Sequence, residues 1–96
     1  MQNIFIAFLK YTKPLAEVDA FLPAHKEHLE KLLGEGKLLI SGRLNPRTGG
    51  VILAKNISRA EFEEFLRADP FSQVSRFEII EFSPRYYDDC LKGIIN

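Results

Sequence analysis

The positions of apolar and polar residues divide the chain into segments with the period of a strand or of a helix. Residues 4–9 are rich in β-branched and aromatic side chains, which predicts a strand. In the next segment apolar positions recur at steps of three and four, which predicts an amphipathic helix. Its apolar stripe consists of Val18, Leu22, His25, Leu29, Leu32 and Leu33. Pro23 predicts either a break after a short first turn, with Pro23 as the first residue of the main helix, or a kink. Gly34 and Gly36 end the helix.

Two further strands are predicted in the middle of the chain. Residues 37–42 and 51–54 are rich in apolar side chains, and residues 45–50 between them contain a proline and a pair of glycines. This pattern predicts a β-hairpin in which Gly49 and Gly50 form the turn.

The last part of the chain predicts one helix and one strand. Ser58 and Glu61 have the spacing of a capping box, so we expect a helix over residues 58–68 that Asp69-Pro70 ends. Residues 74–82 alternate apolar and polar side chains and predict the fourth strand.

The resulting order of elements predicts an α+β fold of the ferredoxin-like βαββαβ class. Two helices would cover one face of a four-stranded antiparallel sheet whose first and third strands are central. Residues 4–9 are apolar at both odd and even positions, so the other face of the sheet also needs a cover. We therefore expect a homodimer through the open sheet face. The C-terminal tail, residues 84–96, is expected to help cover this face at the dimer interface, since Ser83-Pro84 can cap a terminal turn. This turn would place Tyr87, Leu91, Ile94 and Ile95 on one side.

Length and charge narrow the classes of partner. The 96 residues are expected to form a single domain, 1–96. Thirteen Lys and Arg residues balance thirteen Asp and Glu residues, which disfavours nucleic acid as a partner. The run at residues 4–9 is too short to cross a bilayer, so no membrane association is expected. Cys90 is the only cysteine, which favours a reducing, cytoplasmic location.

The predicted topology brings a set of polar residues to one end of the sheet. These are His25, Ser41, Arg43, Arg47 and Asp69. An imidazole can exchange a proton near neutral pH, and a carboxylate within hydrogen-bond reach would orient it, so His25 and Asp69 are candidate catalytic residues. Ser41, Arg43 and Arg47 are candidates for binding a carboxylate or phenolate oxygen. Alternatively, His25 is a buried core residue, Asp69 a turn cap, and the arginines pair with surface acids.

No cofactor or metal site is predicted. His25 and His28 fit no strong zinc signature, and His28 is expected to be a solvated surface residue. Cys90 lies beside Asp88 and Asp89, whose charges disfavour a thiolate, so it is not expected to be a nucleophile.

Five short segments carry a resemblance to a known family. They are VDAFLPAH at 18–25, GKLLISG at 36–42, NPRTGGVI at 45–52, DPF at 69–71 and IEFSP at 80–84. In this order they resemble the YciI-like proteins, which share the YCII-related domain, from Ile4 to Pro84. The resemblance implies a fold of the dimeric α+β barrel type and an active site on a histidine and an aspartate that match His25 and Asp69. One branch of the family resembles enzymes that remove chloride from a chlorinated hydroxyquinone. The chain departs from the family pattern at Arg43, where relatives carry proline after the Ser-Gly pair.

Two functions follow from these observations. The first is a cofactor-independent enzyme in which His25 and Asp69 transfer a proton, in an elimination or isomerisation, on a small cyclic or aromatic acid or phenol. The second is a dimeric protein that binds a small molecule without turnover. A structural dimer module without a ligand is a third reading.

Overall fold

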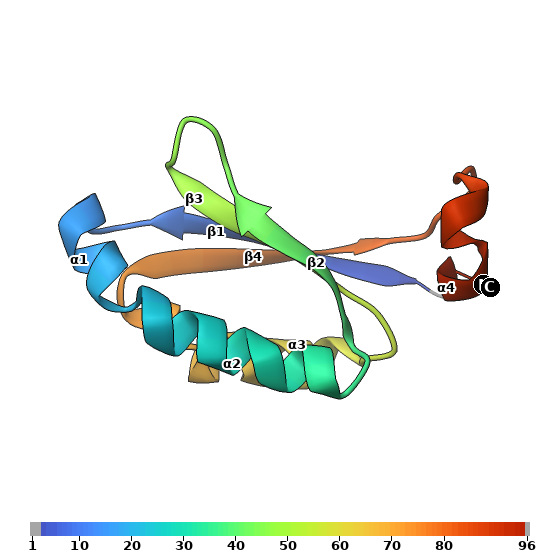
Figure 1. The fold of residues 1–96 in the computed structure, drawn as a ribbon, viewed down its shortest axis with the longest axis horizontal. Helices are drawn as coiled ribbons and strands as arrows, with labels where there is room; N and C mark the ends of the chain where they lie inside the picture. The colour runs from blue at the N-terminus through green and yellow to red at the C-terminus, as the bar shows by residue number, and fades with distance from the viewer. Residues whose placement is uncertain (1–2, 96) are drawn as a thin grey trace.

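The chain folds into strands and helices in the order that the sequence predicts. The computed structural model describes residues 3–95 (Figure 1). Its elements are β1 (Ile4–Tyr11), α1 (Leu15–Ala20), α2 (Leu22–Gly34), β2 (Leu38–Arg43), β3 (Gly49–Ala54), α3 (Arg59–Ala68), the 3₁₀ turn η1 (Pro70–Gln73), β4 (Ser75–Phe82), the 3₁₀ turn η2 (Asp89–Leu91) and α4 (Lys92–Ile95). The four strands form one antiparallel sheet in the order β2-β3-β1-β4, so β1 and β3 are central as predicted.

The strand registers decide which side chains share a face of the sheet. Gly50 of β3 lies opposite Leu9 of β1 and also opposite Arg43 of β2. Directly opposed residues in antiparallel strands point to the same face, so Leu9 and Arg43 flank Gly50 on one face. Ser41 lies opposite Ile52 on that same face.

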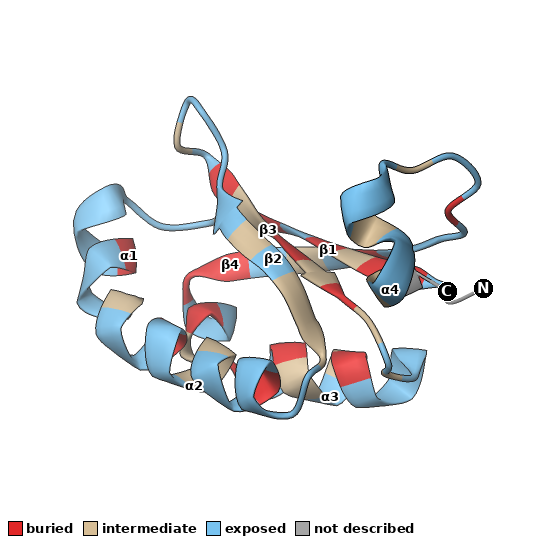
Figure 2. Ribbon diagram, turned by 45° about the vertical axis from the view of Figure 1, so that its right-hand side comes forward, coloured by how far each residue is buried: buried red, intermediate tan, exposed pale blue. Residues whose placement is uncertain are grey.

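Helices α2 and α3 cover this face and enclose the core (Figures 1 and 2). Along β1 the residues that face the helices, Phe5, Ala7 and Leu9, are all buried. They pack with buried side chains of the helices, of the other strands and of the segment from η1 to β4, which include Val18, Leu32, Ile52, Ala54, Phe62, Leu66, Phe71, Val74 and Ile79. Burial of this apolar layer is the main term that stabilises the fold.

The predicted first helix is interrupted at Phe21, which separates α1 from α2. Pro23 is the second residue of α2, where a missing backbone N–H costs no helical hydrogen bond. The break after a short first segment is therefore the arrangement adopted. Leu33 lies at the edge of the predicted stripe and is exposed, so the buried face of α2 is narrower than the sequence pattern indicates.

The prediction that Gly49 and Gly50 form a turn is wrong, because both belong to β3 and pair with β1. A Cβ atom at Gly49 would lie 1.8 Å from the carbonyl oxygen of Leu9, so only glycine allows the two strands to approach this closely. The glycines therefore do not offer a free backbone cradle to a ligand. The hairpin loop comprises the residues between Arg43 and Gly49.

Helix α3 begins and ends as the sequence predicts. The Ser58 hydroxyl oxygen accepts a hydrogen bond from the backbone N–H of Glu61 at 3.1 Å, which is the first half of the capping box. Asp69 and Pro70 end the helix, because the residue before a proline favours an extended backbone. The short turn η1 then leads directly into β4.

The C-terminal segment forms η2 and α4, and α4 lies near the start of β1 (Figures 1 and 2). The cap is Asp88, whose carboxylate accepts from the backbone N–H of Cys90 at 2.9 Å, and not the predicted Ser83-Pro84. Tyr87, Leu91 and Ile94 are half-buried, whereas the side chain of Ile95 lies outside the described part of the chain.

Candidate active site

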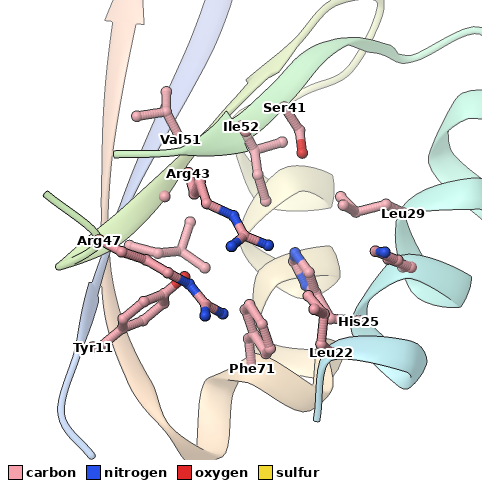
Figure 3. A pocket seen from close by; sticks show the side chains of 14 residues that line it. Tyr11, Leu22, His25, Leu29, Ser41, Arg43, Arg47, Val51, Ile52 and Phe71 are labelled. Atoms are coloured by element: carbon pink, nitrogen blue, oxygen red, sulfur yellow. The ribbon is translucent and has the colours of Figure 1, made fainter. Parts of the chain in front are cut away.

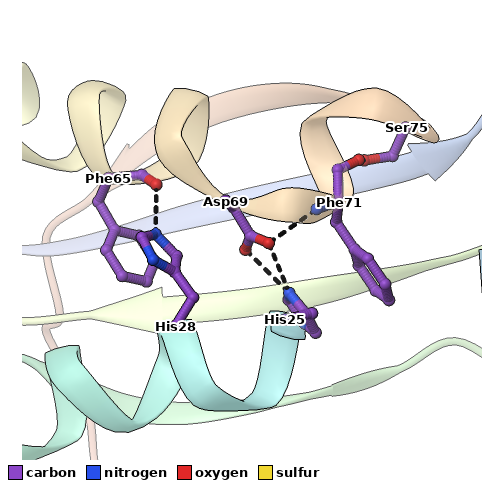
Figure 4. Close-up of polar contacts among 6 residues, drawn as sticks. All are labelled: His25, His28, Phe65, Asp69, Phe71 and Ser75. Carbon is purple, nitrogen blue, oxygen red and sulfur yellow. Dashed lines mark hydrogen bonds and ion pairs between the residues drawn. The ribbon is translucent and has the colours of Figure 1, made fainter. Parts of the chain in front are cut away.

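His25 and Asp69 form a buried polar pair, although 44 positions separate them in the sequence. The Nδ1 atom of His25 lies 2.9 Å from Oδ1 and 2.8 Å from Oδ2 of Asp69 (Figure 4). His25 comes from the first turn of α2, and Asp69 directly follows the last turn of α3. The structure thus brings together the two residues that the predicted topology placed at one end of the sheet.

The backbone around Asp69 fixes its carboxylate. Oδ1 accepts a hydrogen bond from the backbone N–H of Phe71 at 2.9 Å, which makes Asp69 the cap of η1. The carbonyl oxygen of Asp69 accepts from the N–H of Ser72 at 2.8 Å. Asp69 is only 2% exposed, so its carboxylate is held by the fold and reaches the surface only through His25.

This arrangement defines the protonation of the neutral imidazole. A carboxylate only accepts hydrogen bonds, so Nδ1 of His25 carries the proton and donates a hydrogen bond to Asp69. The ring also stacks on Phe71 with a centroid distance of 3.8 Å and an angle of 4°. Within residues 3–95, Nε2 of His25 has no hydrogen-bond partner, so its lone pair is available to a bound molecule.

His25 opens onto a cavity of about 200 Å³ between α2, η1 and the β2–β3 edge of the sheet (Figure 3). The walls are mainly apolar and are formed by Leu9, Leu22, Leu29, Ile52 and Phe71. For comparison, a dry apolar cavity of about 150 Å³ binds benzene. The cavity therefore has room for a single ring with small substituents.

Ser41, Arg43 and Arg47 all line this cavity with His25. Ser41 and Arg43 point into it because both lie on the helix-covered face of β2, and Arg47 reaches it from the hairpin loop (Figure 3). Asp69 does not line the cavity, because the ring of His25 covers it. The candidate site is therefore apolar with a few convergent polar groups, as small-molecule sites commonly are.

The alternative that an arginine pairs with a surface acid is correct for Arg47, whose acidic partner, Asp19, the sequence did not identify. One terminal nitrogen of its guanidinium donates to Oδ1 of Asp19 at 2.5 Å, and the group lies 5.8 Å from the ring centroid of Tyr11. The hydrogen bond from Arg47 lowers the pKa of the Asp19 carboxyl below its ordinary value of 3.8, and the more distant charge of Arg43 adds to this effect. The same hydrogen bond, together with Tyr11, raises the pKa of Arg47.

His28 is not the solvated residue that the sequence pattern predicts. Its Nε2 donates to the backbone carbonyl of Phe65 at 2.8 Å, and its ring stacks on that of Phe65 at a centroid distance of 4.2 Å (Figure 4). In a regular helix this carbonyl would accept from the N–H of Asp69, which bonds to Leu66 instead. His28 therefore joins α2 to the end of α3, next to the His25–Asp69 pair.

Three other features bear on the kind of site. Among residues 3–95, no three His, Cys, Asp or Glu side chains gather closely enough to hold a metal ion. Cys90 is a free, exposed cysteine in the C-terminal segment. No helix in the described part of the chain has the length and apolar character needed to cross a membrane.

Comparison with known proteins adds a family and a fold. The family model of the YCII-related domain matches residues 4–84. Among solved structures, the chain is similar to 5-chloro-2-hydroxyhydroquinone dehydrochlorinase from Burkholderia phenoliruptrix in complex with 2,5-dihydroxybenzoquinone. The TM-score is 0.67 and the sequence identity 20%, and the match covers 88% of this chain and 93% of the other. This similarity supports the ferredoxin-like fold of the dimeric α+β barrel type. No curated protein matches the sequence.

Proposed function

Because the chain belongs to the YCII-related domain family, we propose that it is a cofactor-independent enzyme that transfers a proton on a small cyclic or aromatic acid or phenol. The observation that carries this proposal is the buried His25–Asp69 pair, which presents a free Nε2 to an apolar cavity. A base, a group that orients it and a sheltered place for a ring are the minimum equipment for such chemistry.

The reaction begins when Nε2 of His25 accepts a proton from a hydroxyl or C–H group of the substrate. The imidazolium that forms is stabilised by the Asp69 carboxylate at Nδ1, and the electron pair stays on the substrate. In an elimination, this pair forms a double bond while a leaving group departs with its own bonding pair from the neighbouring atom. In an isomerisation, Nε2 returns the proton to a different atom. Ser41 and Arg47 bind a substrate oxygen, and Arg43 is a further ligand-binding residue.

The solved relative supports the class of ligand. That protein is a dehydrochlorinase whose structure contains a dihydroxybenzoquinone, a single substituted ring. A cavity of about 200 Å³ suits a ligand of this size. A chlorinated substrate is not part of the proposal for this chain.

The test is a thermal-shift screen of small phenols and carboxylic acids, followed by turnover assays on the compounds that bind. His25→Ala should reduce turnover by about 10²–10⁴-fold, the contribution of a positioned general base. Lys31→Ala, an exposed position on the same helix, should leave turnover unchanged. Turnover that survives His25→Ala would exclude the proton-transfer role. Ligands that bind to the cavity but are never converted would instead support the alternative, a non-catalytic small-molecule-binding protein.

The proposed assembly is a homodimer through the face of the sheet opposite the helices, with the tail at residues 84–96 at its border. On that face Phe8, Ile40, Ile80 and Phe82 are 41%, 60%, 43% and 48% exposed. An apolar patch of this kind is unusual on a monomer, and a second copy would cover it. In sedimentation experiments Phe8→Asp should give a monomer. Leu33→Asp, at an exposed leucine on α2, should not change the mass. A monomeric wild-type protein would exclude the dimer.

A cytoplasmic location, proposed because Cys90 is a free thiol, would be tested by cell fractionation.

A further inference from the structure

The two arginines of the cavity differ in whether the protein already neutralises them. Arg47 is ion-paired with Asp19 through one terminal nitrogen, and its Nε is buried without a hydrogen-bond partner. The side chain of Arg43 forms no hydrogen bond or ion pair with any residue in the range 3–95. The Arg43 charge also lowers the pKa of the Asp19 carboxyl, but the hydrogen bond from Arg47 has the larger effect. Arg43 is therefore the arginine of this pair whose charge no neighbouring carboxylate of the described residues neutralises.

The fold directs this free guanidinium into the cavity. Arg43 lies on the helix-covered face at the end of the edge strand β2, directly opposite Gly50. Gly50 has no side chain, and a Cβ atom there would lie 2.9 Å from the carbonyl oxygen of Gly42, so only glycine fits. The side chain of Arg43 therefore has no side chain directly opposite it on β3. Figure 3 shows the Arg43 guanidinium extending over the cavity toward the ring of His25.

We propose that Arg43 makes the cavity selective for an aromatic ring that carries a carboxylate. This inference rests on the proposed function, because it assumes that the cavity is the ligand site. The planar fork of a guanidinium matches the two oxygens of a carboxylate, whereas a phenolate offers only one oxygen. The apolar walls, among them Leu22 and Phe71, hold the ring beside His25. One unpaired guanidinium balances one negative charge, which favours a monoanionic carboxylate over a phosphate dianion.

Benzoate and benzamide provide the test, because they have nearly the same size and shape and differ in charge, and phenol serves as a third probe. Binding is measured by NMR titration of the ¹⁵N-labelled protein, with the amide signals around His25 and Phe71 as reporters. Benzoate should bind the wild-type protein at least about tenfold more tightly than benzamide, as expected for a hydrogen-bonded charge pair. Arg43→Gln should bring this ratio close to one, and Arg43→Lys should retain part of it. Lys31→Gln removes a charge outside the cavity and should leave the ratio unchanged.

The possible failures are distinguishable. If benzamide or phenol binds the cavity as well as benzoate does, or if Arg43→Gln keeps the preference for benzoate, the role of Arg43 is wrong and the proposed function stands. If none of the three compounds shifts the cavity signals, the cavity is not a site for small aromatic ligands, and both proposals fall. Unchanged signals from the core in the Arg43 variants show that the fold is intact.

Discussion

Replacement of Asp69 by asparagine should reverse the tautomer of His25 while the chain still folds. The asparagine oxygen can keep the hydrogen bond from the Phe71 N–H, which is 2.9 Å in the wild-type protein. Its NH₂ group then faces Nδ1 of His25, and two donors cannot bond to each other. The imidazole must therefore move its proton to Nε2, which leaves the cavity with a donor in place of the proposed base.

The cost of this change in stability follows from the contacts that are lost. In Asp69→Asn a buried charge-assisted hydrogen bond is replaced by a neutral one, so the free energy of unfolding should fall by about 1–2 kcal/mol. Asp69→Ala removes the charge-assisted bond and also leaves the Phe71 N–H without an acceptor, so the loss should be about 3–5 kcal/mol. Urea unfolding followed by circular dichroism measures both values.

The tautomers can be read directly by long-range ¹H–¹⁵N NMR at a pH at which both imidazoles are neutral. The chain has only two histidines, and the structure predicts opposite forms for them, with the proton on Nδ1 in His25 and on Nε2 in His28. Asp69→Asn should convert His25 to the Nε2 form, and His28 serves as the internal control. A wild-type His25 with its proton on Nε2, or a tautomer that Asp69→Asn does not change, would refute the reasoning.

Three further predictions concern the parts of the fold that support the site. His28→Ala removes a hydrogen bond to Phe65 and an aromatic stack, so urea unfolding should show that the free energy of unfolding falls by about 1.5–2.5 kcal/mol. A fall below about 0.5 kcal/mol would mean that this contact does not join the helices. Gly49→Ala places a Cβ atom 1.8 Å from a backbone oxygen, so it should lower the free energy of unfolding by more than about 3 kcal/mol or prevent folding. Gly34→Ala adds a Cβ atom with no neighbour within 4 Å, so it should be neutral or stabilising. Equal effects of the two substitutions would contradict the register of β1 and β3. The pKa of Asp19 is lowered in the folded state, so the Asp19 carboxylate contributes fully to stability above its ordinary pKa of 3.8, and this contribution is lost as the pH falls through the lower folded pKa. The difference in unfolding free energy between the wild-type protein and Asp19→Asn should therefore shrink in that acid range. A difference that grows there would contradict the ion pair.

The sequence predicts the topology and the meeting of the imidazole with the carboxylate, because periodicity defines the faces of the elements and the chain order defines which ends adjoin. It does not predict the strand positions of Gly49 and Gly50, since a glycine pair fits a turn as well as a close approach of strands. Nor does it predict the partners of Arg47 and His28. A long arginine side chain can reach several acids, and the acceptor of His28 is a backbone carbonyl, which no sequence pattern marks.

The site divides its two tasks between elements that differ in how freely they can change. The proposed proton chemistry belongs to α2 and to the residue that caps η1, Asp69, which is 2% exposed, so a substitution there disturbs the fold as well as the reaction. The proposed ligand selection belongs to the edge strand β2 and its hairpin loop, where Arg43 is exposed and its side chain has no hydrogen-bond or ion-pair partner within residues 3–95. With these proposed roles, a change at Arg43 should alter the preferred ligand at little cost in stability, whereas a change at Asp69 should lower both stability and turnover. From this division we expect substitutions in the hairpin to change the charge of the ligand that the cavity prefers, while His25 and Asp69 transfer the proton in the same way.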